Sequence, residues 1–190
     1  GQRPDNPVAA DKGERKTLRF VAVGADLDGL AHAEAEAAWV AGRLAIYAGE
    51  RLAFGSLLLA KDATVEQAKA CLAAADLAHL ACHGHFHHVM PMKSGLRMWD
   101  GLLTADEIVP LQLHADLVVL SACDTGLNKL THGDELFGLT RAFLTAGVRS
   151  LLVTLWPVTD LAARLFMESF YSAWIEQGAP WEGHWAFQPI

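Results

Sequence analysis

Apolar residues in this chain form short unbroken runs, and these alternate with longer segments in which apolar residues recur at helical spacing. The runs are too short and too apolar for surface helices, a pattern typical of parallel strands that are covered on both faces. We therefore predict four strands, over Thr17 to Val23, Leu77 to Cys82, Ala115 to Ala122 and Ser150 to Trp156.

The segments between these runs predict helices. Thr64 with Gln67, and Thr104 with Glu107, have the spacing of capping boxes, in which a threonine hydroxyl accepts an amide hydrogen bond three residues on. The second of these helices has to end before Pro110, because the residue preceding a proline is pushed out of helical geometry. Further helices are predicted over residues 33–49, 134–147 and about 159–177.

Strands and helices in this alternation predict an α/β fold with a mostly parallel central sheet and helices on both faces. At 190 residues, of which 52% are hydrophobic, the chain is long enough to bury one good core. Residues 1–16 contain two prolines and no apolar periodicity. We therefore predict a linker from an upstream region, followed by one domain over residues 17–190.

Charge and composition argue against several classes of function. The net charge of −7, without a basic stripe, argues against nucleic-acid binding. No apolar stretch of the sequence has the length of a bilayer span, so no membrane partner is predicted. The three cysteines, Cys71, Cys82 and Cys123, fit neither a disulfide scaffold nor a metal clip, which favours a reducing compartment such as the cytoplasm.

Two residues with catalytic chemistry end two of the predicted strands. Cys123 follows the run at 115–122, and His83 follows the run at 77–82. If these runs are neighbouring parallel strands, both side chains emerge at the same edge of the sheet, where open α/β folds place their active sites. A free thiol has a pKa of about 8.5 and needs a nearby imidazole to react near neutral pH, which His83 can supply.

This pair predicts acyl transfer through a thioester, with Cys123 as the nucleophile and His83 as the base. The N–H groups of Gly84 and Cys123 are the predicted donors to the oxyanion that forms when the thiolate attacks. The chemistry calls for no cofactor and no metal. A cysteine at a strand end is more often a small buried apolar residue, and we interpret Cys71 and Cys82 in that way.

Five segments of the sequence, in the order HLACHGHF, DGLLTADEI, ADLVVLSACDTGL, GLTRAFLTAGVRSLLVTLWPVTD and ESFY, resemble the CHAT domain family. These domains are caspase-like and separase-like cysteine proteases that are often attached to tetratricopeptide repeats. The resemblance spans roughly residues 17–178 and implies a caspase-like three-layer sandwich, with His83 as base, Cys123 as nucleophile and His79 as a structural histidine. It also implies a protein or peptide substrate and an upstream sensor region, of tetratricopeptide or another type, that regulates cleavage.

The C-terminal end departs from the family pattern. CHAT domains usually continue after the ESFY helix with an alanine-rich helix that carries a glutamine, and then with a closing aromatic strand. Here WIEQG runs directly into APWEGHWAFQPI, so this helix is missing or shortened, and Trp185 to Phe187 resembles the closing strand. The departure bears on stability and on the substrate groove, and it leaves the dyad intact.

Two other functions stay open. The segment His83 to His88, HGHFHH, approximates the HxHxDH zinc signature of metallo-β-lactamase-like hydrolases, in which imidazoles and a carboxylate hold the metal. His87 replaces the aspartate and the expected antiparallel strand pattern is absent from the sequence, so the later histidines are interpreted as loop residues beside the cleft. The other alternative is a catalytically silent CHAT-like domain that serves only for docking, against which the intact dyad speaks.

The resemblance also implies where substrate specificity is set. In caspase-like folds, residues at the ends of the first and last central strands contact the side chain before the scissile bond. Three acids occupy these positions here, Asp26 and Asp28 after the first strand and Asp160 after the last, so we predict cleavage after arginine or lysine. Trp156 is the predicted wall of this pocket. Each acid has an ordinary alternative as a helix cap or turn residue, and Trp156 can be a core aromatic.

Overall fold

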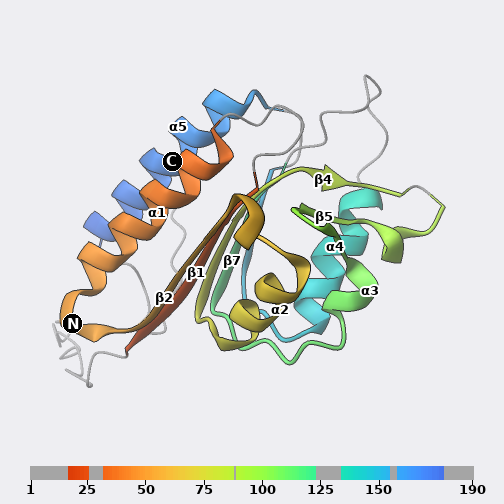
Figure 1. Cartoon of the computed structure of the whole chain (residues 1–190), viewed down its shortest axis with the longest axis horizontal. Helices are drawn as coiled ribbons and strands as arrows, with labels where there is room; N and C mark the ends of the chain where they lie inside the picture. Colours follow the sequence, from red (N-terminus) through yellow and green to blue (C-terminus); the bar gives the residue numbers. More distant parts are fainter. Residues whose placement is uncertain (1–16, 26–31, 88, 123–133, 155–157, 178–190) are drawn as a thin grey trace, which may run out of the picture.

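The protein has three layers, with a sheet between two layers of helices (Figure 1). The computed structural model describes residues 17–25, 32–87, 89–122, 134–154 and 158–177. The predicted linker at 1–16 and the predicted closing strand at 185–187 lie outside these ranges. The caspase-like α/β sandwich expected from the sequence is confirmed for the part that the structure describes.

Five parallel strands form the central sheet, in the order β2-β1-β3-β7-β8. Their bounds are β1 Leu18–Gly24, β2 Leu52–Leu59, β3 Leu77–Ala81, β7 Leu117–Ser121 and β8 Leu151–Val153. The four predicted strands are confirmed, and β3 and β7 are parallel neighbours as predicted. The edge strand β2 was not predicted, because its consecutive exposed residues at 53–55 interrupt any run of buried positions.

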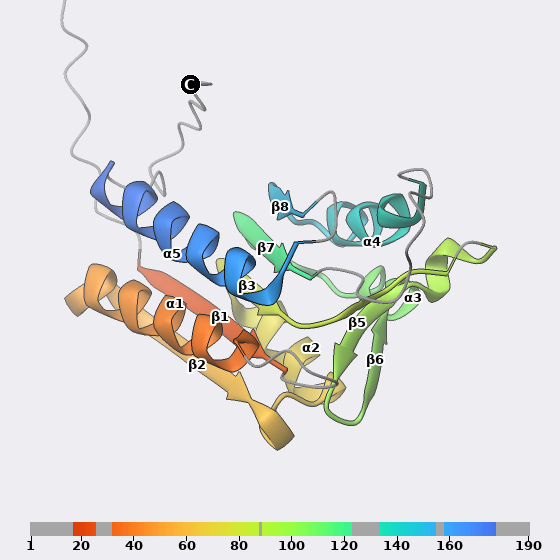
Figure 2. The ribbon, with the colours of Figure 1, turned by 90° about the horizontal axis from the view of Figure 1, so that it is seen from above.

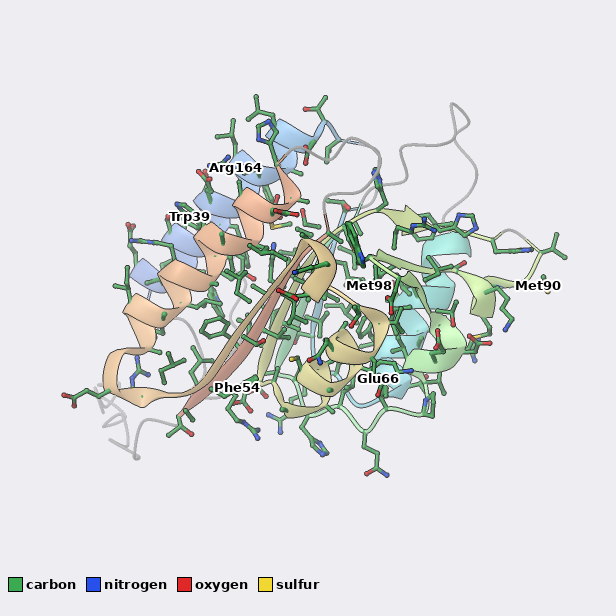
Figure 3. The ribbon with its side chains drawn as sticks, viewed as in Figure 1. Trp39, Phe54, Glu66, Met90, Met98 and Arg164 are labelled. Atoms are coloured by element: carbon green, nitrogen blue, oxygen red, sulfur yellow. The ribbon has the colours of Figure 1, made fainter. Side chains whose placement is uncertain are left out.

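Helices cover both faces of this sheet (Figure 2). Their bounds are α1 Ala33–Ala48, α2 Val65–Ala74, α3 Ala105–Ile108, α4 Asp134–Thr145 and α5 Asp160–Glu176. α1 and α5 lie side by side on one face, and α2, α3 and α4 cover the other. Figure 3 shows Trp39 and Arg164 on the first face and Glu66 and Met98 on the second. None of the helices in the described ranges is long and apolar enough to cross a membrane.

Each face of the sheet has its own hydrophobic cluster, because successive residues of a strand point to opposite faces. In β3, Ala78 and Leu80 belong to the cluster under α2, α3 and α4, while Leu77 belongs to the cluster under α1 and α5. In β7, Val118 and Val119 divide between the two clusters in the same way. All residues of β3 and β7 are buried, so these strands occupy the middle of the domain.

Threonine side chains begin the helices where the sequence predicts them. The Thr64 hydroxyl accepts the Gln67 N–H at 3.3 Å and caps α2. Thr104 and Glu107 form a complete capping box on α3, with the Glu107 carboxylate accepting the Thr104 N–H at 3.1 Å. α3 ends two residues before Pro110, as predicted. These local bonds mark the starts of the two helices.

A second sheet of three antiparallel strands follows His83, and the sequence did not predict it. Its strands are β4 Gly84–His85, β5 Gly95–Met98 and β6 Gly101–Thr104. In the turn between β5 and β6, the Asp100 carboxylate accepts the Val65 N–H at 2.8 Å. This hairpin therefore connects the residues after His83 to the first turn of α2.

Pairs of aspartate and arginine hold the strands together at their amino ends. The Asp76 carboxylate, just before β3, accepts bonds from the Arg19 backbone N–H at 3.0 Å, from its Nε at 3.1 Å and from its guanidinium at 2.7 Å. Asp116, at the same place before β7, pairs with Arg149, and its N–H donates to the Asp76 carbonyl at 2.7 Å. The pairs tie β1 to β3 and β7 to β8 from the edge opposite His83.

Loss of the first pair is expected to destabilise the fold. Asp76→Ala should lower the free energy of unfolding by about 1–3 kcal/mol, because it deprives the Arg19 backbone and guanidinium of a buried acceptor. Urea denaturation measures the change. Glu66→Ala is the control: the Glu66 side chain is 85% exposed in its pair with Lys69, so the expected change is within about 0.5 kcal/mol. Equal effects of the two substitutions would contradict the role given to Asp76.

Candidate active site

The carboxyl ends of β3 and β7 lie level at one edge of the sheet. The register pairs Ala81 with Ser121, and the Cys82 N–H continues the ladder by donating to the Ser121 carbonyl at 3.3 Å. His83 and Cys123 each follow the last paired residue of their strand by two positions. Cys123 lies outside the described residues, so the described part of the site is its His83 side.

The backbone of Gly84 lies against the end of β7. A Cβ atom at this position would be 3.8 Å from the Ala122 carbonyl oxygen and 2.9 Å from the ring of Phe86. The half-buried His83 uses its carbonyl to accept the Arg97 N–H at 2.8 Å. Along an antiparallel ladder, hydrogen-bonded and non-hydrogen-bonded residue pairs alternate. Because His83 and Arg97 are a hydrogen-bonded pair, the next pair, Gly84 with Leu96, is non-hydrogen-bonded, and the Gly84 N–H points away from β5.

Further hydrogen bonds lock the edge of the sheet around His83. The Ala25 N–H, just after β1, donates to the Ala81 carbonyl at 3.0 Å. The Thr154 hydroxyl, just after β8, donates to the Ala122 carbonyl at 3.2 Å. The ends of β1, β3, β7 and β8 are thereby held in a fixed relation to one another.

Asp160 is the predicted substrate residue that the structure describes, while Asp26, Asp28 and Trp156 lie outside the described ranges. Asp160 is half-buried in the first turn of α5. Its carboxylate accepts the His32 N–H at 2.8 Å, at the start of α1. Asp160 therefore joins the amino-terminal ends of α1 and α5, whereas the side-chain cap of α5 itself is Thr159, whose hydroxyl accepts the Ala162 N–H.

The environment of Cys82 suits a core residue and not a nucleophile. Its side chain is buried, and this burial, with a smaller contribution from the charge of Glu36, raises the pKa of the thiol to about 12. Such a thiol stays protonated near neutral pH and is unreactive. Cys71 is half-buried in α2, with its Sγ 3.5 Å from the Ser56 hydroxyl. The interpretation of Cys82 as a core residue is confirmed.

His79 lies in the middle of β3, four residues before His83, and its side chain is fully buried. Its Nε2 is 2.9 Å from Oε1 of Glu36 in α1, and its Nδ1 is 3.2 Å from the hydroxyl of Tyr171 in α5. Both ring nitrogens thus have partners inside the core. His79 cannot act as the base for a thiol at the edge of the sheet.

The sequence analysis missed Glu36 and Tyr171 as partners of this histidine. A signal for Glu36 exists, because it lies four residues before Val40 and eight before Leu44, on the buried stripe of α1. An acid on such a stripe requires a partner in the core. Tyr171 gives a weaker signal, since a tyrosine on a buried stripe resembles any other core aromatic.

The described histidines after His83 lie in β4 and just after it. His85 is exposed in β4. The His87 N–H donates to the Ser94 hydroxyl at 2.9 Å, and the His87 Nδ1 accepts the Met90 N–H at 3.1 Å. Figure 3 shows that Met90 lies away from α1 and α5. Among the residues that the structure describes, which do not include His88, no group of three or more His, Cys, Asp or Glu is placed to hold a metal ion.

Comparisons with known proteins point to one family. The model of the CHAT domain family matches residues 5–182 of this chain. Tetratricopeptide repeat protein 28 of Homo sapiens is 46% identical to the chain over 72 residues, and the protein of the same name from Mus musculus is 46% identical over the same length. The aligned segment is 38% of this chain and 3% of each of those proteins, so the chain spans a small part of these relatives.

The stability of the protein is expected to fall above about pH 9, because Cys82 keeps its proton in the folded state to about pH 12. Between these values the unfolded chain loses a proton that the folded chain retains. The free energy of unfolding then decreases as the pH rises, by up to about 1.4 kcal/mol per pH unit for one group. Tyr171 contributes with the same sign, since burial raises its pKa well above 10.

Urea denaturation from about pH 8 to about pH 11 measures this slope. Cys82→Ala should make the alkaline slope shallower, since it removes one of the two groups. Cys71→Ala is the matched control, and its slope should follow that of the unchanged protein. A slope that Cys82→Ala leaves unaltered would contradict the assignment.

Proposed function

Since the chain belongs to the CHAT domain family, we propose that it is a cysteine endopeptidase that cleaves a protein partner through a thioester acyl-enzyme. Cys123 is the nucleophile and His83 the base. The observation that carries the proposal is the register of β3 and β7, which pairs the residues two positions before His83 and Cys123. Parallel strands rise equally per residue, so both side chains leave the sheet at one edge.

Each step of the proposed reaction uses a named group. His83 accepts the thiol proton, and the Cys123 thiolate forms a bond to the scissile carbonyl carbon, whose oxygen becomes an oxyanion. The N–H groups of Gly84 and Cys123 donate to this oxygen. The imidazolium then protonates the departing amine and the thioester is left. Finally His83 takes a proton from water, and the resulting hydroxide attacks the carbonyl carbon of the thioester. The C–S bond breaks, the acid is released, and the Cys123 thiolate takes its proton back from His83.

The backbone around Gly84 supports its place in the oxyanion hole. Its N–H points away from β5, and the lack of a side chain leaves room for the Phe86 ring, which a Cβ would approach to 2.9 Å. One oxyanion donor contributes about 2.7–4 kcal/mol to catalysis in other hydrolases. A backbone N–H that the pairing with β5 does not use therefore suits a donor to the substrate oxygen.

An upstream sensor region completes the proposal. CHAT domains are often fused to tetratricopeptide repeats, and both relatives named above are tetratricopeptide repeat proteins. We expect such a region to hold the protease inactive until a signal arrives. The nucleophile has to stay reduced, and Cys71 and Cys82 are free thiols, which supports a reducing compartment such as the cytoplasm.

Specificity for arginine or lysine before the cleaved bond is the second part of the proposal. Asp160 is in the first turn of α5, the helix that follows β8, and Asp26 and Asp28 follow β1 in the sequence. A carboxylate there pairs with a guanidinium or ammonium group of the substrate. Trp156 is proposed as a wall of this pocket.

Cys123→Ala and His83→Ala should each lower the rate of peptide cleavage by about 10³-fold or more, because the thiol and the imidazole act as one unit. For the same reason the double variant should be no worse than either single variant. Fluorogenic peptides with arginine or lysine before the cleaved bond measure the rate. Cys71→Ala, Cys82→Ala and His85→Ala are matched controls and should retain most of the activity.

Retained cleavage in Cys123→Ala would rule out the protease assignment. A lack of cleavage by the unchanged chain as well as by the control variants would favour a silent docking domain. Metal analysis addresses the remaining alternative. One tightly held zinc ion per chain, with activity that chelators abolish and alkylation spares, would favour the zinc hydrolase.

Asp26→Asn or Asp160→Asn should lower kcat/KM for substrates with arginine or lysine before the cleaved bond. The loss of a charged partner should weaken transition-state stabilisation by about 1–3 kcal/mol. Asparagine at 160 keeps an oxygen for the His32 N–H, so the junction of α1 and α5 is retained. Substrates with a neutral residue before the cleaved bond are the internal control and should react at an unchanged rate. A peptide library that reveals preference for an acidic or large apolar residue would refute this pocket.

A further inference from the structure

Three polar side chains from three elements meet in the core between the sheet and the α1–α5 layer. Glu36 of α1, His79 of β3 and Tyr171 of α5 are 1%, 0% and 0% exposed. Oε1 of Glu36 is 2.9 Å from Nε2 of His79, and the Tyr171 hydroxyl is 3.2 Å from Nδ1 of the same ring. The imidazole is therefore the middle member of a buried network that joins both helices to the central strand.

The chemistry of the three groups completes the network. A carboxylate only accepts, so Nε2–H of His79 donates to Glu36. Burial and the charge of Glu36 raise the pKa of Tyr171 well above 10, and its phenol stays protonated beside Nδ1. Phe170 and Trp174 enclose this phenol, with ring centroids 5.2 Å and 5.9 Å from that of Tyr171.

A network of this kind is a costly way to fill a core. Removing a carboxylate, an imidazole and a phenol from water costs free energy that apolar side chains of similar volume do not cost. What the hydrogen bonds add is direction, since each is favourable over a narrow range of distances and angles. The network thus sets the places of α1 and α5 relative to β3 more closely than apolar packing does.

The network lies on the strand that leads to His83. His79 is in the middle of β3, and His83 follows it by four residues, two positions past the end of the strand. Glu36 is one helical turn from His32, and its N–H donates to the His32 carbonyl at 2.8 Å. The His32 N–H in turn bonds to Asp160. α1 and α5 are therefore joined twice, at the edge through Asp160 and in the core through His79.

We propose that Glu36 and Tyr171 are positioning residues for the dyad: acting through His79, they hold the carboxyl end of β3 so that His83 faces Cys123. The inference rests on the proposed cysteine-protease function and adds two residues that touch no reacting atom. When either bond to His79 is lost, the end of β3 gains freedom to shift. The imidazole then stabilises the thiolate less well, and the Cys123 thiol becomes less acidic.

The test is the pH dependence of Cys123 alkylation by iodoacetamide in the 190-residue chain and in Tyr171→Phe and Glu36→Gln. Each substitution changes one polar group and nearly preserves the side-chain volume. We expect the pKa of the Cys123 thiol to rise by about one unit in each variant, so that alkylation near neutral pH slows by up to about tenfold. In peptide cleavage, kcat should fall while KM stays the same, since the substrate contacts are unchanged.

Phe170→Leu is the matched control, because it removes a ring next to Tyr171 without removing a hydrogen bond of the network. It should lower the melting temperature and leave the pH dependence of alkylation unchanged. If Tyr171→Phe and Glu36→Gln behave in the same way as this control, the network only stabilises the fold and the inference is overturned. Should Glu36→Gln fail to fold, Tyr171→Phe decides the matter, since it removes a single hydroxyl from a ring that keeps its packing.

The pKa of Cys123 in the unchanged chain distinguishes a failure of the proposed function from a failure of the positioning role. A Cys123 thiol with an ordinary pKa near 8.5 in that chain would contradict the proposed function, and the positioning role with it. A lowered pKa that neither Tyr171→Phe nor Glu36→Gln alters would contradict the positioning role alone, and the dyad would stand.

Discussion

The parallel pairing of β3 with β7 is the constraint on which the candidate active site depends. Ladder hydrogen bonds decide that Ala81 lies opposite Ser121, and everything at the edge of the sheet follows from that register. A slip by one residue would move His83 along its strand by about 3.3 Å and turn its side chain to the other face. Asp76 and Asp116 resist such a slip from the amino ends of the two strands.

Burial then decides which thiol beside His83 can react. Cys82 continues the ladder of β3 and is enclosed by the core, where burial removes the water that would stabilise a thiolate. The charge of Glu36 acts in the same direction and helps to keep both Cys82 and Tyr171 protonated. A nucleophile therefore has to follow the buried part of its strand. Position 123 comes two residues after Ser121, the last paired residue of β7.

Elements with a single dominant periodicity could be predicted from the sequence, and elements without one could not. β3 and β7 are buried on both faces and mostly apolar, while Thr104 with Glu107 marks the start of α3. β2 is half-exposed at the edge of the sheet, and β4 has two residues, too few for any period. The partners of His79 are 43 and 92 positions away in the sequence, so no local pattern predicts these bonds.

A crystal structure of the chain bound to a peptide aldehyde that ends in arginine tests the His83 and Cys123 dyad most directly. We predict a hemithioacetal on the Cys123 Sγ, with a His83 ring nitrogen within about 4 Å of that sulfur and the Gly84 N–H directed at the new oxygen. A His83 ring turned into the core, or His85 facing the sulfur in its place, would contradict the assignment of the base and the role given to the register of β3 and β7.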